Sequence, residues 1–251
     1  MTLIIMFLAT VALIDGAAAA APAEHCDVPQ AFLSSESDLT RVMKEVQDHH
    51  RVDISVVGTG SSSLPGPDGA RFAYPARLEQ TLTQALPGVA VKVTAHVQSR
   101  ETTADMAKGL AKILADDKPA LVIWQAGTAD ALSGVEPEEF RASLDGGVGT
   151  IENGNADVIL MNMQYSPHTE SMLDVSTYAD IMHWAAQQHG ALLFDRLGIM
   201  RNWNDSGTFD LYAATKNYDM ARRVHECIGR ALATQIISAA HLDAMRMQTT
   251  R

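Results

Sequence analysis

The sequence predicts one α/β domain, a three-layer αβα sandwich around a central parallel sheet of about five strands. Short apolar runs alternate with amphipathic stretches along most of the 251 residues. Several of these runs are continuously apolar, which is typical of strands that are covered on both faces. The connections are short, as in right-handed crossovers between parallel strands. A hydrophobic content of 47% and a charged content of 20% fit such a globular domain.

The expected elements follow one another in a regular order. The first helix has apolar residues at i, i+3, i+4 and i+7, with Ser35 or Ser37 as its cap; these residues are Leu39, Val42, Met43 and Val46. The expected strands are 52–57, 89–95, 120–125, 157–163 and a shorter one at 191–194. The expected helices between and after them are 74–86, 103–115, 137–152, 178–189 and 219–240.

The N-terminus has the composition of an export signal. Residues 3–14 are almost wholly apolar, and residues 17–23 offer small residues for cleavage, although no Lys or Arg precedes the apolar run. The run is shorter than the ~20 residues of a transmembrane helix. We therefore expect a signal peptide at 1–23, a single mature domain at 24–251 without a membrane span, and a periplasmic or secreted protein.

Charge and cysteine content exclude several classes of function. A net charge of -11 argues against nucleic acid or an anionic membrane as the partner. Cys26 and Cys227 either form a disulfide or remain thiols, and two cysteines cannot build a zinc ribbon or an iron–sulfur site. Histidines lack ligand spacing on the expected helices, and no glycine-rich nucleotide loop is present. We expect no metal and no cofactor.

The most informative segment is the turn 60–66, Gly-Ser-Ser-Ser-Leu-Pro-Gly, which follows the first expected strand. A strand that ends in such a turn is where α/β enzymes present a nucleophile or bind an anion. A serine hydroxyl is a weak nucleophile and needs an imidazole that a carboxylate orients. The alternative is that this Ser/Gly turn only caps a helix or closes a loop and has no catalytic role. His225 is the best candidate for the imidazole, ahead of His168.

This turn, the segment Gly127-Thr128-Ala129-Asp130 and the late His225 resemble motif blocks of the SGNH, or GDSL-like, hydrolase family. The resemblance covers most of the mature chain and implies the flavodoxin-like fold of that family. It implies Ser62 as the nucleophile and His225 as the base, with Asp219 or Asp210 orienting it. We further expect an oxyanion and substrate site at the carboxyl edge of the sheet, made of Gly60, Ser61, Ser63, Arg100, Gly127, Asp130 and Gln164.

The sequence departs from the family pattern at several of these positions. Ala129 stands in place of the asparagine that donates to the oxyanion, and Arg100 lies near the place of a second-block glycine. Arg222 stands where the family places the acid. Losing one oxyanion donor costs about 10²–10³ in rate. Arg100 could instead bind an anionic group of the substrate, or pair with Asp130 or Glu101.

Two functions remain open from the sequence. The first is an exported serine esterase or acyl hydrolase that acts on an ester of an envelope glycan, a lipid or a small molecule, with acyl transfer as a weaker variant. The second is a catalytically impaired protein of the same fold that binds a glycan or a protein partner in the cell envelope. The substrate and the oligomeric state cannot be read from the chain.

Overall fold

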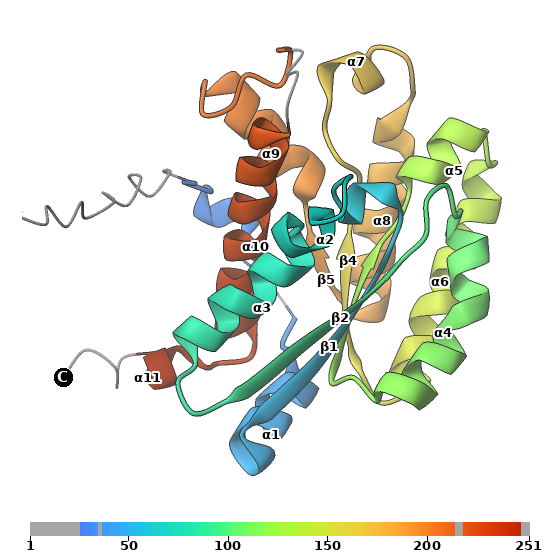
Figure 1. The fold of residues 1–251 in the computed structure, drawn as a ribbon. Helices are drawn as coiled ribbons and strands as arrows, with labels where there is room; N and C mark the ends of the chain where they lie inside the picture. The colour runs from blue at the N-terminus through green and yellow to red at the C-terminus, as the bar shows by residue number, and fades with distance from the viewer. Residues whose placement is uncertain (1–25, 35–36, 214–217, 247–251) are drawn as a thin grey trace, which may run out of the picture.

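A five-stranded parallel sheet with the order β2-β1-β3-β4-β5 forms the centre of the molecule (Figure 1). The structure is a computed structural model that describes residues 26–34, 37–213 and 218–246. Between β1 and β3 the strand order reverses, and such a switch point is where open α/β sheets bind ligands. The strands are β1 (Arg51–Gly58), β2 (Ala90–Val97), β3 (Leu121–Gln125), β4 (Asp157–Met161) and β5 (Leu192–Phe194).

Helices cover both faces of the sheet, which confirms the predicted three-layer sandwich. In Figure 1, α3 (Tyr74–Ala85) and α10 (Asp219–Ala239) lie together on one face, and α4 (Thr103–Asp117), α6 (Pro137–Asn153) and α8 (Val175–His189) lie on the other. The remaining helices are α1 (Thr40–His49), α2 (Gly69–Phe72), α5 (Thr128–Ser133), α7 (Pro167–Glu170), α9 (Arg196–Asp205) and α11 (Asp243–Arg246), with 3₁₀ turns η1 (Gln30–Phe32) and η2 (Gly60–Ser62).

Most expected elements are present, and the differences have local causes. β4 ends at Met161 instead of residue 163, because both ends of the Asn162 amide bind the start of α9: its Oδ1 accepts from the Leu197 N–H, and its Nδ2 donates to Asp195. Helix α8 begins earlier than expected, at Val175, where the Asp174 carboxylate caps its first turn. Helices α5 and α9 were not expected.

The core is formed by the central strands and the inner faces of the helices. The side chains of β3 are fully buried, and Trp124 points toward α6. A Cβ on Gly147 of α6 would overlap the ring of Trp124, so this glycine allows helix and strand to approach closely. This packing holds β3 at a fixed depth, and its last residue, Gln125, at the carboxyl edge of the sheet.

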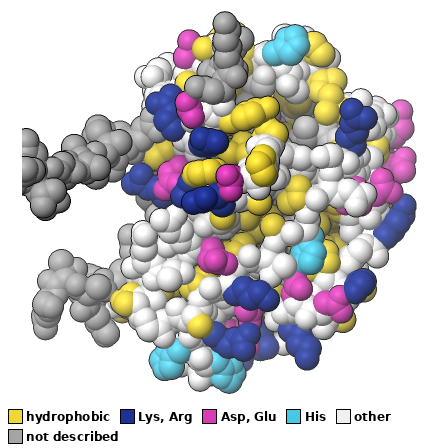
Figure 2. Space-filling model, viewed as in Figure 1, with side chains coloured by type: hydrophobic (Ala, Val, Ile, Leu, Met, Phe, Trp, Pro, Cys, Tyr) yellow, Lys and Arg dark blue, Asp and Glu magenta, His cyan; other side chains and the backbone are white. Residues whose placement is uncertain are grey.

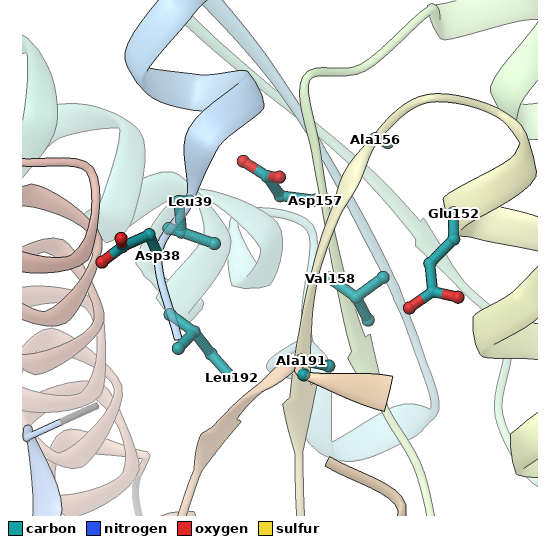
Figure 3. Close-up of a pocket in the computed structure, with 9 residues that line it drawn as sticks. Asp38, Leu39, Glu152, Ala156, Asp157, Val158, Ala191 and Leu192 are labelled. Carbon is teal, nitrogen blue, oxygen red and sulfur yellow. The ribbon is translucent and has the colours of Figure 1, made fainter. Parts of the chain in front are cut away.

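The cap of α1 comes from a distant part of the chain. Leu39 occupies the N-cap position, so the prediction of Ser37 as the cap is wrong, and Ser35 lies outside the described residues. The Asp157 carboxylate at the start of β4 accepts the backbone N–H groups of Arg41 and Val42, each at 2.9 Å. Figure 3 shows Asp157 below the first turn of α1, in a pocket at the amino edge of the sheet.

A disulfide joins Cys26 to Cys227, across 201 residues of sequence. It ties the beginning of the described chain to the middle of α10. This answers the question that the sequence left open. Because α10 packs against α3, the bond also secures the helix layer on that face of the sheet.

Replacing Cys26 with serine should destabilise the protein by about 2–5 kcal/mol, because opening so long a loop raises the entropy of the unfolded chain. Denaturant unfolding of wild type and Cys26→Ser measures the difference. Reduced wild-type protein should behave like the variant. Equal stability of oxidised wild type and Cys26→Ser would contradict a closed disulfide.

Candidate active site

Ser62 lies at the carboxyl edge of the sheet, where β1 ends and the η2 turn begins. Its side chain is fully buried. Its hydroxyl donates to Oε1 of Gln125 at 2.8 Å and lies 3.0 Å from the hydroxyl of Tyr74. An amide oxygen and a neutral phenol are not bases at neutral pH, so neither partner activates the serine as a nucleophile.

Gln125 holds the serine turn in place. Its Oε1 accepts hydrogen bonds from the Ser62 hydroxyl, from the Ser61 hydroxyl at 3.1 Å and from the backbone N–H of Thr59 at 3.3 Å. Its Nε2 is buried and has no hydrogen-bond partner among the described residues. The sequence offered a signal for Gln125 that we did not use: it is the polar last residue of an otherwise apolar strand.

Tyr74, the first residue of α3, connects the serine turn to α10. Its phenol contacts Ser62, and its backbone N–H donates to Nδ1 of His225 at 2.9 Å. The two rings stack with their centroids 5.9 Å apart. Burial raises the pKa of the Tyr74 phenol, although its hydrogen bond to Ser62 opposes this shift. The phenol is therefore neutral near pH 7.

His225 is buried in α10 and is held as a neutral ring. Burial lowers its pKa from 6.5 to about 3, and the nearby Arg196 guanidinium acts in the same direction. Its Nδ1 is occupied as an acceptor, and no hydrogen bond joins His225 to Ser62 among the described contacts. The structure therefore does not show the direct contact that a Ser62–His225 relay requires, and the relay stays a prediction.

The two aspartates expected to orient His225 lie elsewhere. Asp219 is exposed in the first turn of α10, 3.6 Å from Arg222. The Asp210 carboxylate is exposed and accepts the backbone N–H groups of Tyr212 and Ala213, which closes a local turn. Neither carboxylate contacts His225 in the described part of the chain.

Arg196, the first residue of α9, is fully buried beside the serine turn. Its guanidinium donates to the backbone carbonyl of Ser61 at 3.1 Å and to Oε1 of Gln164 at 3.0 Å, and lies 5.7 Å from the Tyr74 ring centre. Burial lowers its pKa to about 10, so it is charged near pH 7. The described residues provide it with no carboxylate partner. The sequence signal for Arg196 is the charged pair Asp195-Arg196, which follows the short apolar strand at the carboxyl edge of the sheet.

The predicted oxyanion segment has a structural role. The Asp130 carboxylate on α5 is buried and accepts from the backbone N–H of Thr103 at 2.9 Å and from its hydroxyl at 2.8 Å. It thereby anchors the first turn of α4 and does not pair with Arg100. Gly127 has a φ of 93°, in the region that favours glycine, and begins α5. Ala129 is buried and brings no donor in place of the asparagine amide.

Arg100 occupies a backbone position suited to glycine. Its φ is 69°, a conformation that is unfavourable for residues with a Cβ. Its side chain is exposed, and the described residues provide no ion pair for it, neither with Asp130 nor with Glu101. The backbone at Arg100 therefore has the left-handed conformation that glycine adopts without strain.

The remaining predicted residues surround the same turn. Gly60 begins η2, and a Cβ there would lie 3.2 Å from the Ser99 hydroxyl. The half-buried Ser63 makes only a weak hydrogen bond, at 3.5 Å, to the Leu64 carbonyl. Gln164 contacts the site through Arg196. The fold therefore brings Ser61, Ser62 and Gln164 together, and leaves Asp210 and Asp219 apart from them.

The described residues contain neither a metal-ligand cluster nor a membrane-spanning helix. No group of three or more histidine, cysteine, aspartate or glutamate side chains could hold a metal ion there. None of the helices in the described ranges is long and apolar enough to cross a bilayer.

The fold is that of the SGNH, or GDSL-like, hydrolase class that the sequence motifs predicted. The chain belongs to the Non-GDSL lipase-like family, which matches residues 25–242. No curated protein matches the sequence.

Solved structures with the same fold include LAE5, an alpha/beta hydrolase from the metagenome of Lake Arreo, Spain. It is 19% identical with a TM-score of 0.60 and covers 76% of this chain and 96% of its own. TesA is 21% identical with a TM-score of 0.58, covering 73% of this chain and 99% of its own. A catalytic mutant of Axe2, an acetylxylan esterase from Geobacillus stearothermophilus, is 18% identical with a TM-score of 0.59, covering 74% and 94%.

Protonation of His225 should oppose folding at acidic pH. Because its pKa is about 3 in the folded protein and 6.5 ordinarily, the unfolded chain binds the proton first, and stability falls as the pH drops below 6.5. By pH 4.5 this amounts to about 3 kcal/mol. The variant His225→Gln keeps an acceptor for the Tyr74 N–H. Between pH 7 and 4.5 its free energy of unfolding should fall by about 3 kcal/mol less than that of the wild type. Parallel pH profiles of the two proteins would contradict the lowered pKa.

Arg100→Gly should stabilise the protein by about 1 kcal/mol, because it removes the strain of a positive φ. Arg100→Ala removes the same side chain without relieving the backbone and should give no such gain. Thermal or denaturant unfolding compares the three proteins. If glycine and alanine have the same effect, the backbone is not strained at this position.

Proposed function

We propose that this protein binds a ligand at the carboxyl edge of its sheet, in the cell envelope, with little or no ester turnover. The observation that carries the proposal is the set of partners of Ser62: an amide oxygen and a neutral phenol. Without a base, the hydroxyl keeps the low reactivity of an ordinary alcohol. The lipase-like family and its fold favour a glycan, lipid or small-molecule ligand over nucleic acid.

The polar groups of the site also support binding. Arg196 brings a buried positive charge, and the Nε2 of Gln125 and the Nε of Arg196 are buried donors without described partners. Buried polar groups are normally hydrogen-bonded, and leaving one unpaired costs about 1–3 kcal/mol. A site with spare donors and no base suits an electron-rich ligand better than proton transfer.

Serine esterase activity is the second candidate, and the position of Ser62 favours it. Ser62 is the last residue of η2, the turn that follows the first strand, and the chain belongs to a lipase-like family. For catalysis, His225 would have to release the Tyr74 N–H and reach the serine hydroxyl, and one carboxylate would have to approach the ring. Each of these changes breaks a contact that the described structure contains.

Export is part of the proposal. The apolar segment 3–14 and the small residues after it have the composition of a signal peptide, and lie outside the described residues. A disulfide between Cys26 and Cys227 supports an oxidising compartment. Sequencing the N-terminus of the mature protein should find a start near Glu24, and an intact Met1 would overturn export.

A fluorophosphonate probe should fail to label Ser62, because the reagent reacts with activated serines. Wild type, Ser62→Ala and His225→Gln are incubated with the probe, and adducts are mapped by mass spectrometry. We expect the same low background in all three, with an active serine hydrolase as the reagent control. Stoichiometric labelling of Ser62 that disappears in His225→Gln would establish the esterase function instead.

A further inference from the structure

The outer edge of β2 is a strand edge that no described strand covers. β2 ends the strand order on its side of the sheet, and β1 is its neighbour on the inner side. The backbone N–H groups of Ala90 and Gln98 donate to carbonyls on the β1 side. Because the backbone groups of successive strand residues point to opposite sides, four residues of β2 direct theirs away from the sheet. They are Val91, Val93, Ala95 and Val97.

The outward groups of β2 are largely without partners in the described part of the chain. The N–H of Val93 donates to Oε2 of Glu79 on α3 at 2.6 Å. The described residues give no such partner to the N–H groups of Ala95 and Val97. A row of free donors and acceptors on a strand edge is a template for a further extended segment. Pairing of a peptide with such an edge is a common mode of recognition.

A groove of about 400 Å³ lies beside this edge, between α3 and β2. Val93, Ala95 and Val97 line it on the strand side, and small residues that include Ala73 and Ala76 line it on the helix side. Alternate side chains of an added strand would face this groove, and its small lining residues leave room for them. Figure 2 shows hydrophobic side chains at the surface over the region of α3 and β2, with acidic and basic ones around them.

Two charged residues line the groove, Arg71 and Glu79. Arg71 lies near the serine turn, at the carboxyl edge where β2 ends with Val97. Its ion pair with Asp68 is exposed and 3.7 Å long, so another carboxylate can compete for the guanidinium. Glu79 lies beside Val93, about 13 Å further down the strand. The groove therefore presents a positive and a negative group to the same face of an added strand.

We propose that the β2 edge and this groove bind an extended peptide segment of a protein partner, which adds to the sheet parallel to β2. A basic side chain of the segment pairs with Glu79, and an acidic side chain four residues later pairs with Arg71. A carbonyl of the segment takes over the Val93 N–H, which releases the Glu79 carboxylate for the basic side chain. This inference goes beyond the proposed function, because the partner is a protein and the Ser62 hydroxyl takes no part in its binding.

The probe is the acetylated and amidated peptide Thr-Lys-Thr-Val-Thr-Glu-Thr, in which Lys, Val and Glu share one face of an extended strand. An NMR titration of the isotope-labelled mature protein measures its affinity and the amide signals that move. We expect the signals of β2 to shift. Two control peptides should bind at least about tenfold more weakly. One has Glu in place of Lys, and the other has methylated amide nitrogens at the two central threonines, which face β2 in a parallel segment.

Equal binding of either control peptide would overturn the proposal, because the charge or the strand pairing would then contribute nothing. Absence of binding by the probe peptide would overturn it as well. The same holds if the shifted signals lie away from β2 and α3.

Substitutions in the protein test the same contacts from the other side. Ala95→Pro removes an outward N–H and leaves the hydrogen bonds between β2 and β1 in place, because proline is tolerated on the free side of an edge strand. Glu79→Gln removes the charge and keeps an acceptor for Val93. Each should weaken peptide binding about tenfold or more. Ala95→Ser, which keeps the N–H, and Glu139→Gln, at an exposed position of α6, are the matched controls.

Thermal unfolding verifies that each variant is folded. If Ala95→Pro does not fold, the peptide with methylated amides tests the same hydrogen bonds on the unaltered protein. Wild-type affinity in folded Ala95→Pro would overturn strand addition, and wild-type affinity in Glu79→Gln would overturn the charge pairing.

A second copy of the chain is the other occupant that a free strand edge can accept. Light scattering after size-exclusion chromatography gives the mass of the protein in solution. A dimer that Ala95→Pro converts to a monomer would overturn the proposal, because β2 of another copy would then occupy the edge. A monomer that binds the peptide supports it. Labelling of Ser62 by the fluorophosphonate would overturn the proposed lack of turnover and leave the peptide result standing.

Discussion

Tyr74 is the residue on which the arrangement of the site depends. Its phenol contacts the Ser62 hydroxyl, its backbone N–H binds His225, and its ring lies beside the Arg196 guanidinium. One buried residue thus connects the serine turn, α3, α10 and the start of α9. Because these contacts use both the side chain and the backbone of Tyr74, the serine and the histidine are each satisfied without contacting one another.

Burial determines the charge state of this site. The same low-dielectric surroundings lower the pKa values of His225 and Arg196, but with different consequences. The histidine, with an ordinary pKa of 6.5, becomes neutral at all but very acidic pH. The guanidinium starts so high that it keeps its charge at neutral pH. The result is a site with a fixed cation and a neutral imidazole, and no described hydrogen bond joins that imidazole to the Ser62 hydroxyl.

Helix α3 links the site to the groove beside it. Its first residue contacts the serine, and its body forms one wall of the groove with Ala76. Just before this helix, the Phe72 ring lies 5.1 Å from the guanidinium carbon of Arg71 and 4.5 Å from that of Arg222 on α10. Helix α3 therefore connects the serine turn to the helix layer that α10 and the disulfide secure.

The sequence by itself determined the fold class, the order of the elements and the place of the serine turn. The spacing of apolar residues and a Gly/Ser-rich turn after a strand are local signals that the sequence contains directly. The tertiary structure alone decided which side chains meet. The contact of Tyr74 with His225 spans 151 residues, and that of Arg196 with Ser61 spans 135. Such contacts depend on how the helices pack, as does the cap that Asp157 provides to α1. Their partners therefore cannot be read from local patterns, whereas the strand that precedes the Ser62 turn can.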